Sequence, residues 1–141
     1  MSVIVEMVDH SERYEEPGDG LPLTLIVNGA VITGDVIPAA AWVKRVDGEF
    51  GGDTWLGDVA DDLAREARLS RESMDLPAAQ WTPEHSKAAD VEPTSVHLEN
   101  ARIISTGFAW TAPTYWRVRI TDVSGWCYGV MATKEDPPDD E

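Results

Sequence analysis

His97 and Glu99 are the residues of this chain whose types and spacing best suit acid–base chemistry. They alternate in the segment VHLEN, and alternate positions of a β-strand point to the same face of a sheet, so an imidazole and a carboxylate can meet there. An enzyme that used this pair would need a concave pocket around both side chains. Because no nucleophile motif accompanies the pair, the sequence favours a solvent-facing polar stripe instead.

The other residues that often carry chemistry predict neither a metal site nor a cofactor. The three histidines lie far apart in the sequence, and the single cysteine excludes an internal disulfide and a cysteine-built metal site. Cys127 has no basic neighbour in its aromatic-rich segment, so we expect a buried structural thiol. Asp58, Asp61 and Asp62 fall on the outer face of a predicted helix, where carboxylates are usually solvated.

Arg117 and Arg119 place two positive charges on one face of the predicted strand YWRVRI, in a chain that is otherwise acidic. They can bind an acidic partner or the acidic end of another copy, or they can pair with Glu99 and nearby acids across strands. The sequence leaves both alternatives open. Two tryptophans lie in predicted loops, where aromatic side chains that find no core serve as contact anchors. The candidate partner-binding residues are therefore Arg117, Arg119, Trp110, Trp81, His97 and Glu99.

The composition limits the classes of partner. The chain has 26 acidic and 11 basic residues, which gives a net charge of -15. A field of this sign repels phosphate backbones and anionic membranes, so we expect neither nucleic acid nor a membrane as a partner. The short apolar start has no basic region before it, and no run of about 18 apolar residues occurs, so neither a signal peptide nor a spanning helix is predicted. We expect a cytoplasmic protein.

Five β-type segments predict the body of the fold. Two β-branched runs in LTLIVNGAVITGDVIP flank Asn28-Gly29, a dipeptide that suits a tight hairpin, and Gly34 allows a bend or a close backbone approach. VHLENARII, YWRVRI and WCYGVM supply further strands by their alternation, with Trp116 and Trp126 expected in the core. The expected fold class is α+β, with a small, strongly curved antiparallel β-barrel or sheet.

The other segments surround this single domain, which we place at residues 21–131. Residues 1–20 are predicted as an N-terminal extension whose apolar start is an extra strand or a short helical turn. A helical insert is predicted at about 39–69, and its second helix, capped by Asp53 or Thr54, is expected to lie on the β-unit. The apolar face of that helix recurs at spacings of three and four residues: Trp55, Leu56, Val59, Leu63 and Ala67.

Two further segments are predicted to lack regular structure. Residues 70–95 hold three prolines and many small polar residues, which predicts a long loop that Trp81 can pin to the body. Residues 132–141 are rich in proline and acids and predict a disordered acidic tail.

The hairpin LTLIVNGAVITGDVI, with its glycines five residues apart, and the strand VHLENA resemble the Sm-like small barrels. This resemblance implies a five-stranded barrel, of a kind that often assembles into rings by edge pairing and often binds RNA. It covers about a third of the chain. The helical insert is foreign to that family, and the acidic composition opposes RNA binding.

The order of the hairpin, a helical segment, VHLENARII and then YWRVRITDVSGWCYGV resembles the gas vesicle accessory protein U family over residues 21–131. The matching positions are Leu25, Gly29, Val31, Thr33, Gly34, His97, Leu98, Glu99, Ala101, Trp116, Arg117, Arg119, Ile120, Val123, Gly125, Gly129 and Val130.

This second resemblance implies a non-enzymatic cytoplasmic protein that associates with the gas vesicle shell or with other gas vesicle proteins and promotes vesicle clustering or maturation. Contacts among copies of the chain are expected as well. The alternative function is an Sm-like ring that binds a protein or, against the charge of the chain, RNA. No cofactor and no metal is expected in either case.

Overall fold

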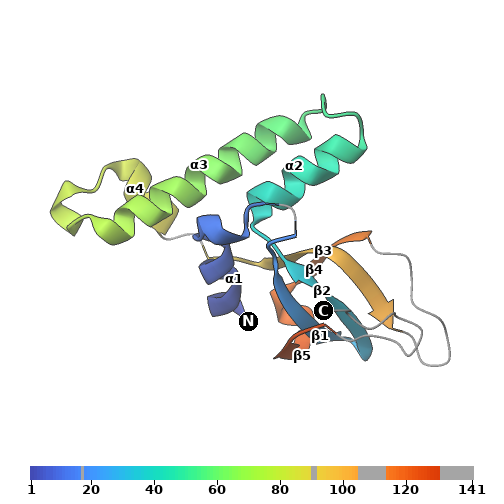
Figure 1. Cartoon of the computed structure of the whole chain (residues 1–141). Helices are drawn as coiled ribbons and strands as arrows, with labels where there is room; N and C mark the ends of the chain where they lie inside the picture. Colours follow the sequence, from blue (N-terminus) through green and yellow to red (C-terminus); the bar gives the residue numbers. More distant parts are fainter. Residues whose placement is uncertain (17, 90–91, 105–113, 131–141) are drawn as a thin grey trace, which may run out of the picture.

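The structure is a computed structural model of the chain, and it describes residues 1–16, 18–89, 92–104 and 114–130 (Figure 1). The strands are β1 (Leu21–Val27), β2 (Ala30–Val36), β3 (Ser95–Ile104), β4 (Thr114–Arg119) and β5 (Val123–Tyr128). The helices are α1 (Ser2–Asp9), α2 (Ala39–Glu49), α3 (Leu56–Asp75) and α4 (Pro83–Ala89), with 3-10 turns η1 (Glu12–Tyr14), η2 (Ala78–Gln80) and η3 (Ile120–Asp122). One antiparallel sheet and a group of helices confirm the α+β class.

The hairpin of β1 and β2 forms where the sequence predicts it. Its two-residue turn has positive φ angles at both positions, 49° at Asn28 and 80° at Gly29, so the turn needs residues that tolerate the left-handed region. Val27 pairs with Ala30 on either side of the turn, and the register continues to Leu21 and Val36.

A bulge in β3 bends the sheet opposite Gly34. The pairing of β2 with β3 shifts between Thr33 and Asp35, and Asn100 on β3 has a φ of 50°. A Cβ atom at Gly34 would lie 3.0 Å from the Cα of Ala101, so only glycine fits this close approach without a shift of the backbone. The predicted role of Gly34 as a place of close backbone approach is confirmed.

The sheet curls because its two edge strands are consecutive in the chain. The strand order is β4-β3-β2-β1-β5, and η3 alone connects β4 to β5. The edges of a flat five-stranded sheet would lie about 19 Å apart, whereas a three-residue 3-10 turn advances only about 6 Å. The predicted curvature is therefore present. Among the described residues the sheet is open, however, with no pairing of β4 with β5, so the closed barrel is not observed.

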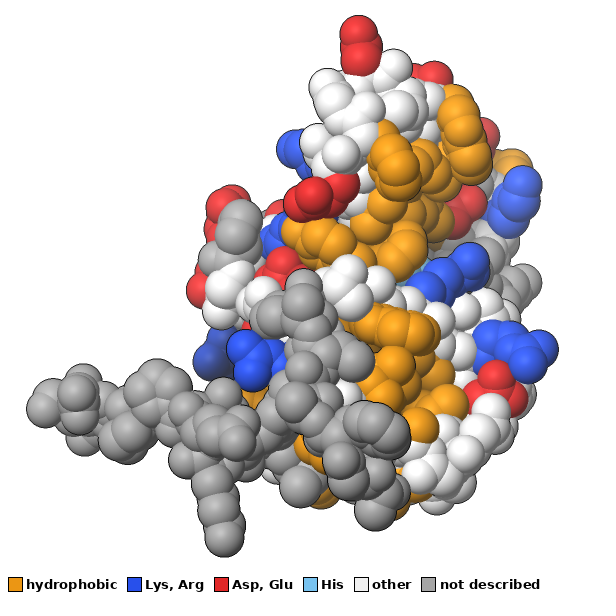
Figure 2. Space-filling model, turned by 90° about the vertical axis from the view of Figure 1, so that its right-hand side faces the viewer, with side chains coloured by type: hydrophobic (Ala, Val, Ile, Leu, Met, Phe, Trp, Pro, Cys, Tyr) orange, Lys and Arg blue, Asp and Glu red, His pale blue; other side chains and the backbone are white. Residues whose placement is uncertain are grey.

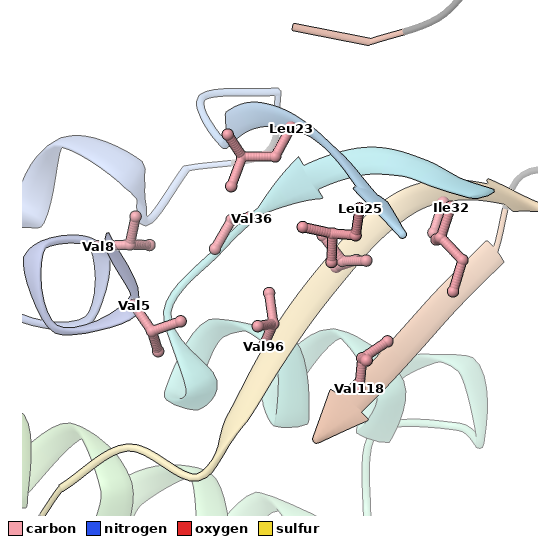
Figure 3. Close-up of a cluster of buried hydrophobic side chains, with 10 residues drawn as sticks. Val5, Val8, Leu23, Leu25, Ile32, Val36, Val96 and Val118 are labelled. Carbon is pink, nitrogen blue, oxygen red and sulfur yellow. The ribbon is translucent and has the colours of Figure 1, made fainter. Parts of the chain in front are cut away.

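The core lies between the concave face of the sheet and α1 (Figure 3). Val5 and Val8, three residues apart on α1, point toward buried side chains of β1 and β2 such as Leu23 and Val36. Leu25 and Leu98 are fully buried. Residues 1–20 were predicted as an extension outside the β-unit, but their first helix supplies part of its core.

The helical insert is longer than the sequence predicts. The helix predicted to end near 69 continues through Asp75, and α4 follows, so most of the loop expected at 70–95 is helical. Two prolines caused this error, because Pro77 and Pro83 lie at helix starts, where proline is well tolerated. A second correction concerns packing: α3 packs against α2 and α4 and does not lie on the β-unit, and the α2–α3 hairpin extends away from the sheet (Figure 1).

Candidate partner-binding site

Arg117 and Arg119 lie on the edge strand β4, at alternate positions, as predicted. Their partners across the strand pair are His97 and Ser95 on β3. Both arginines are exposed. The Nε of Arg119 donates to Asp122 at 3.0 Å, whereas Arg117 makes no ion pair within the described parts of the chain. The positive charge of Arg117 is therefore free to meet a partner.

The two arginines line a hollow that is open to solvent and has a volume of about 670 Å³. We call it the arginine hollow. Its other walls are Ser2 at the start of α1, residues 92–95 before and at the start of β3, and Ile120 with Thr121 in η3. The backbone N–H of Ile120 donates to the carbonyl of Thr94 at 2.9 Å and so fixes two of the walls relative to each other.

This hollow is suited to an acidic protein segment. A guanidinium group binds a carboxylate through two parallel hydrogen bonds, and hydroxyl groups such as that of Ser2 add further donors. Pro93 and Ile120 give the hollow an apolar part, and Glu92 is the acidic residue in its wall. These residues come from three separate segments, so their proximity was not visible in the sequence.

Glu99 does not pair with Arg117 or Arg119. It forms an ion pair with Arg45 of α2, and its Oε1 accepts a hydrogen bond from the backbone N–H of Gly18 at 3.4 Å. The alternative in which the two arginines pair with Glu99 across strands is therefore wrong. Glu99 instead fastens the helical insert to the sheet.

His97 shares a sheet face with Glu99, as predicted, but both side chains are buried beneath α2, so the expected solvent-facing stripe is wrong. The indole of Trp42 lies edge-on to the imidazole, with ring centroids 5.3 Å apart, and donates from Nε1 to the carbonyl of Leu98 at 3.2 Å. Strand alternation showed which face the two residues share. It did not show that a helix covers that face.

Burial holds His97 in its neutral form. Desolvation, and to a lesser extent the nearby positive charge of Arg117, lower the pKa of His97 from 6.5 to about 4. Its Nδ1 has no hydrogen-bond partner among the described residues. Neither His97 nor Glu99 lines the arginine hollow or the hollow beside α3 and α4.

The tryptophan predictions have mixed outcomes. Trp81 was predicted to pin its segment to the body, but its Nε1 donates to the carbonyls of Ser73 and Leu76, at 3.0 and 3.1 Å, which belong to the same segment at the end of α3. Trp110 lies outside the described residues, as does the predicted acidic tail. Trp116 and Trp126, expected in the core, are 37% and 46% exposed. They lie on the two edge strands, where a side chain has neighbours on one side only.

Cys127, predicted to be a buried thiol, is exposed on β5. Asp58, Asp61 and Asp62 are solvated, as predicted.

A second hollow of about 250 Å³ lies beside α3 and α4 and is lined by charges of both signs, among them Asp62 and Lys87. Within the described ranges, no three His, Cys, Asp or Glu side chains gather as metal ligands would. No described helix has the length and apolar character to cross a membrane.

Two exposed aromatic residues between α2 and α3 were not predicted as contact residues from the sequence. Phe50 and Trp55 are 70% and 72% exposed. Trp55 was assigned to the apolar face of the second helix, but it precedes α3 and points to solvent. The signal was available, since both residues flank the segment GGDT between two predicted helices, and an aromatic side chain in a loop is a contact candidate.

Comparison with known proteins identifies a family. Residues 2–131 match the family model described as "Gas vesicle protein GvpU-like". The match covers α1, the sheet and the whole helical insert, and it confirms the more specific of the two resemblances seen in the sequence. Neither a curated protein nor a solved structure matches the chain.

Proposed function

Because this chain belongs to the GvpU-like family of gas vesicle proteins, we propose that it is a non-enzymatic accessory protein that promotes vesicle clustering or maturation through protein–protein contacts. Membership of the family makes it a gas vesicle-associated protein. Its place of action in this proposal is the surface of vesicles in the cytoplasm.

The arginine hollow is the observation that carries the proposal. A net charge of -15 keeps copies of the chain apart at long range. Within that field, the hollow presents the guanidinium groups of Arg117, which has no ion pair among the described residues, and of Arg119, which is paired with Asp122. Charge complementarity then selects an acidic segment, either on another gas vesicle protein or on a second copy of the chain.

Weak contacts of this kind suffice when many copies meet on one particle. Each further contact forms at high effective concentration once the first has formed, so the overall avidity far exceeds the affinity of one hollow. A small domain can then bring vesicles together without catalysis.

The test reverses the charge of the hollow. The variant Arg117→Glu with Arg119→Glu, which we call the hollow variant, should reduce co-flotation of the purified protein with purified gas vesicles at least tenfold. The matched control is Lys44→Glu with Lys87→Glu, which makes the same change of charge at exposed sites on α2 and α4. Circular dichroism should show that both variants keep the fold. If the hollow variant co-floats with vesicles as well as the control does, the hollow does not bind gas vesicles.

An Sm-like ring is the second candidate, and the two edge strands are the observation that favours it. Within the described chain, β4 and β5 each pair with a neighbour on one side only. Edge pairing between copies would give one discrete oligomer that persists at high salt, whereas contacts through the arginine hollow weaken as salt is raised. Retention of RNA at low salt would support the RNA-binding form of this candidate, and its absence would exclude that form.

A further inference from the structure

The segment between α2 and α3, residues 50–55, forms an aromatic tip at the free end of the helical hairpin. Phe50 and Trp55 expose most of their surface there. Figure 2 shows the side of the molecule that lies at the right of Figure 1, and on its upper part hydrophobic side chains gather over the hairpin, beside acidic side chains. Aromatic side chains that project into solvent on a raised element are typical anchors of a protein interface.

The aromatic tip is held in a fixed shape by one buried carboxylate. Asp47, near the end of α2, accepts hydrogen bonds at Oδ1 from the backbone N–H of Thr54, at 3.0 Å, and from its hydroxyl. The carbonyl of Asp47 accepts from the N–H groups of Phe50 and Gly52 at 3.0 and 2.9 Å. Because the loop is already ordered by these bonds, binding through it costs little conformational entropy.

The surroundings of the aromatic tip are strongly acidic. Residues 46–64 contain six acidic residues and no Lys or Arg. Glu49, Asp53 and Asp58 are exposed close to the two aromatic side chains. A surface that binds this tip must therefore offer positive charge together with apolar contact.

The arginine hollow offers both positive charge and apolar contact. Arg117 and Arg119 supply the positive charge, and Pro93 and Ile120 supply apolar lining. The hollow is open to solvent and has a volume of about 670 Å³, which leaves room for an indole side chain to enter. A guanidinium group also binds the face of an indole directly, and Trp and Arg are the residues most often found at interface hot spots.

The two surfaces lie on different parts of the same molecule. The aromatic tip lies at the end of the α2–α3 hairpin that points away from the sheet (Figure 1), separated from the sheet by the length of α2, about 16 Å for its 11 residues. The hollow is lined by residues of the N-terminus, β3, β4 and η3 and of the segment before β3. Two packed helices hold the tip away from the sheet, so it does not enter the hollow of its own copy.

We infer that the aromatic tip of one copy docks in the arginine hollow of a second copy. The inference rests on the proposed function, since it names the acidic partner of that same hollow. Such a contact joins two different surfaces, so each copy binds one neighbour through its tip and another through its hollow. Contacts of this head-to-tail type build open chains unless their geometry closes into a ring. Chains of copies would link vesicles that each carry the protein.

The test uses the purified full chain without vesicles, in sedimentation velocity at low salt over a range of concentrations. The wild-type chain should form a series of species larger than the monomer. The tip variant, Phe50→Ala with Trp55→Ala, and the hollow variant should each remain monomeric. The control Met74→Ala removes a side chain that is 69% exposed on α3 and should assemble as the wild type does.

Mixing the two defective variants gives the most specific result. The tip variant keeps its hollow and the hollow variant keeps its tip, so an equimolar mixture should form dimers and no larger species. A contact that uses the same surface on both copies, tip against tip or hollow against hollow, would instead let one of the two variants dimerise by itself.

The inference is overturned if the wild-type chain stays monomeric, if the tip variant assembles as the wild type does, or if the mixture forms no dimer. These failures are distinct from failure of the proposed function, which is measured on vesicles. If the hollow variant loses vesicle binding while the tip variant still assembles, the hollow binds another gas vesicle protein and the proposed function stands.

Discussion

The curled sheet and the α2–α3 hairpin differ in what they bury. The sheet and α1 enclose large apolar side chains, with Leu25 and Leu98 fully buried between them. In α3 the buried side chains are small, namely Ala60, Ser70 and Ser73, and the flanking Trp55 is left in solvent. The sheet therefore supplies most of the stability, and the hairpin presents surface away from it. In this fold the regions of greatest stability and of greatest exposure to partners are separate.

The largest expected effect is a loss of stability in the sheet. Leu25→Ala should lower the free energy of unfolding by about 3–4 kcal/mol, because it leaves a cavity in a fully buried site. Met74→Ala on α3 should change it by less than about 0.5 kcal/mol. Urea denaturation of both variants measures the contrast. Equal losses would show that the hairpin and the sheet share one core.

His97 should make the stability of the sheet depend on pH. Its pKa is 6.5 in the unfolded chain and about 4 in the folded protein, so the unfolded chain takes up a proton first as the pH falls. The contribution of His97 to stability is therefore present above pH 6.5 and is lost as the pH falls toward 4. The free energy of unfolding should fall by about 3 kcal/mol, because a pKa difference of one unit between the folded and unfolded states corresponds to about 1.36 kcal/mol. Relative to His97→Gln, the wild type should lose this amount between pH 7 and pH 4. A difference between the two proteins that does not change with pH would contradict the burial of a neutral imidazole.

Asp9 serves as a control of opposite sign. Desolvation raises its pKa from 3.8 to about 6, while a hydrogen bond from the backbone N–H of Ala39 acts in the other direction. Its contribution to stability is present below pH 3.8 and is lost as the pH rises through 6. Relative to Asp9→Asn, the wild type should therefore become more stable as the pH falls from 7 to 4.

The smallest of these effects should be local to the hairpin. Asp47→Ala removes a buried acceptor from the N–H and hydroxyl of Thr54, at an expected cost of about 2 kcal/mol. Amide hydrogen exchange should become faster at residues 50–57 and stay unchanged in β1 and β2, because the stability of the sheet does not depend on this carboxylate. Faster exchange throughout the sheet would show that the aromatic tip is coupled to the core.

The sheet was largely predictable because local patterns determine it. Asn28-Gly29 fixes the hairpin, and alternation in β3 separates Val96 and Leu98 from the face of His97. Features that depend on contacts between distant segments were not predictable. The cover that α2 places over His97 follows from how elements pack and not from any one segment. The same holds for the sheet, which is open among the described residues.

The candidate site shows the same limit. The sequence identified Arg117 and Arg119, because two positive charges on one strand of an acidic chain are visible in one segment. It did not reveal the hollow, whose walls include Ser2 and Thr94 from remote segments. Trp55 was misplaced because its spacing to Leu56 and Val59 also fits a helix face, and periodicity does not show where a helix begins.

The most direct test of the account is the clustering of purified gas vesicles by the protein, followed by light scattering as salt is raised. The length over which charges interact falls from about 10 Å at 0.1 M salt to about 3 Å at 1 M. The account predicts clusters with the wild type at low salt that dissolve as salt is added, and none with the hollow variant. Clusters of equal size with the hollow variant, or clusters that persist at high salt, would contradict it.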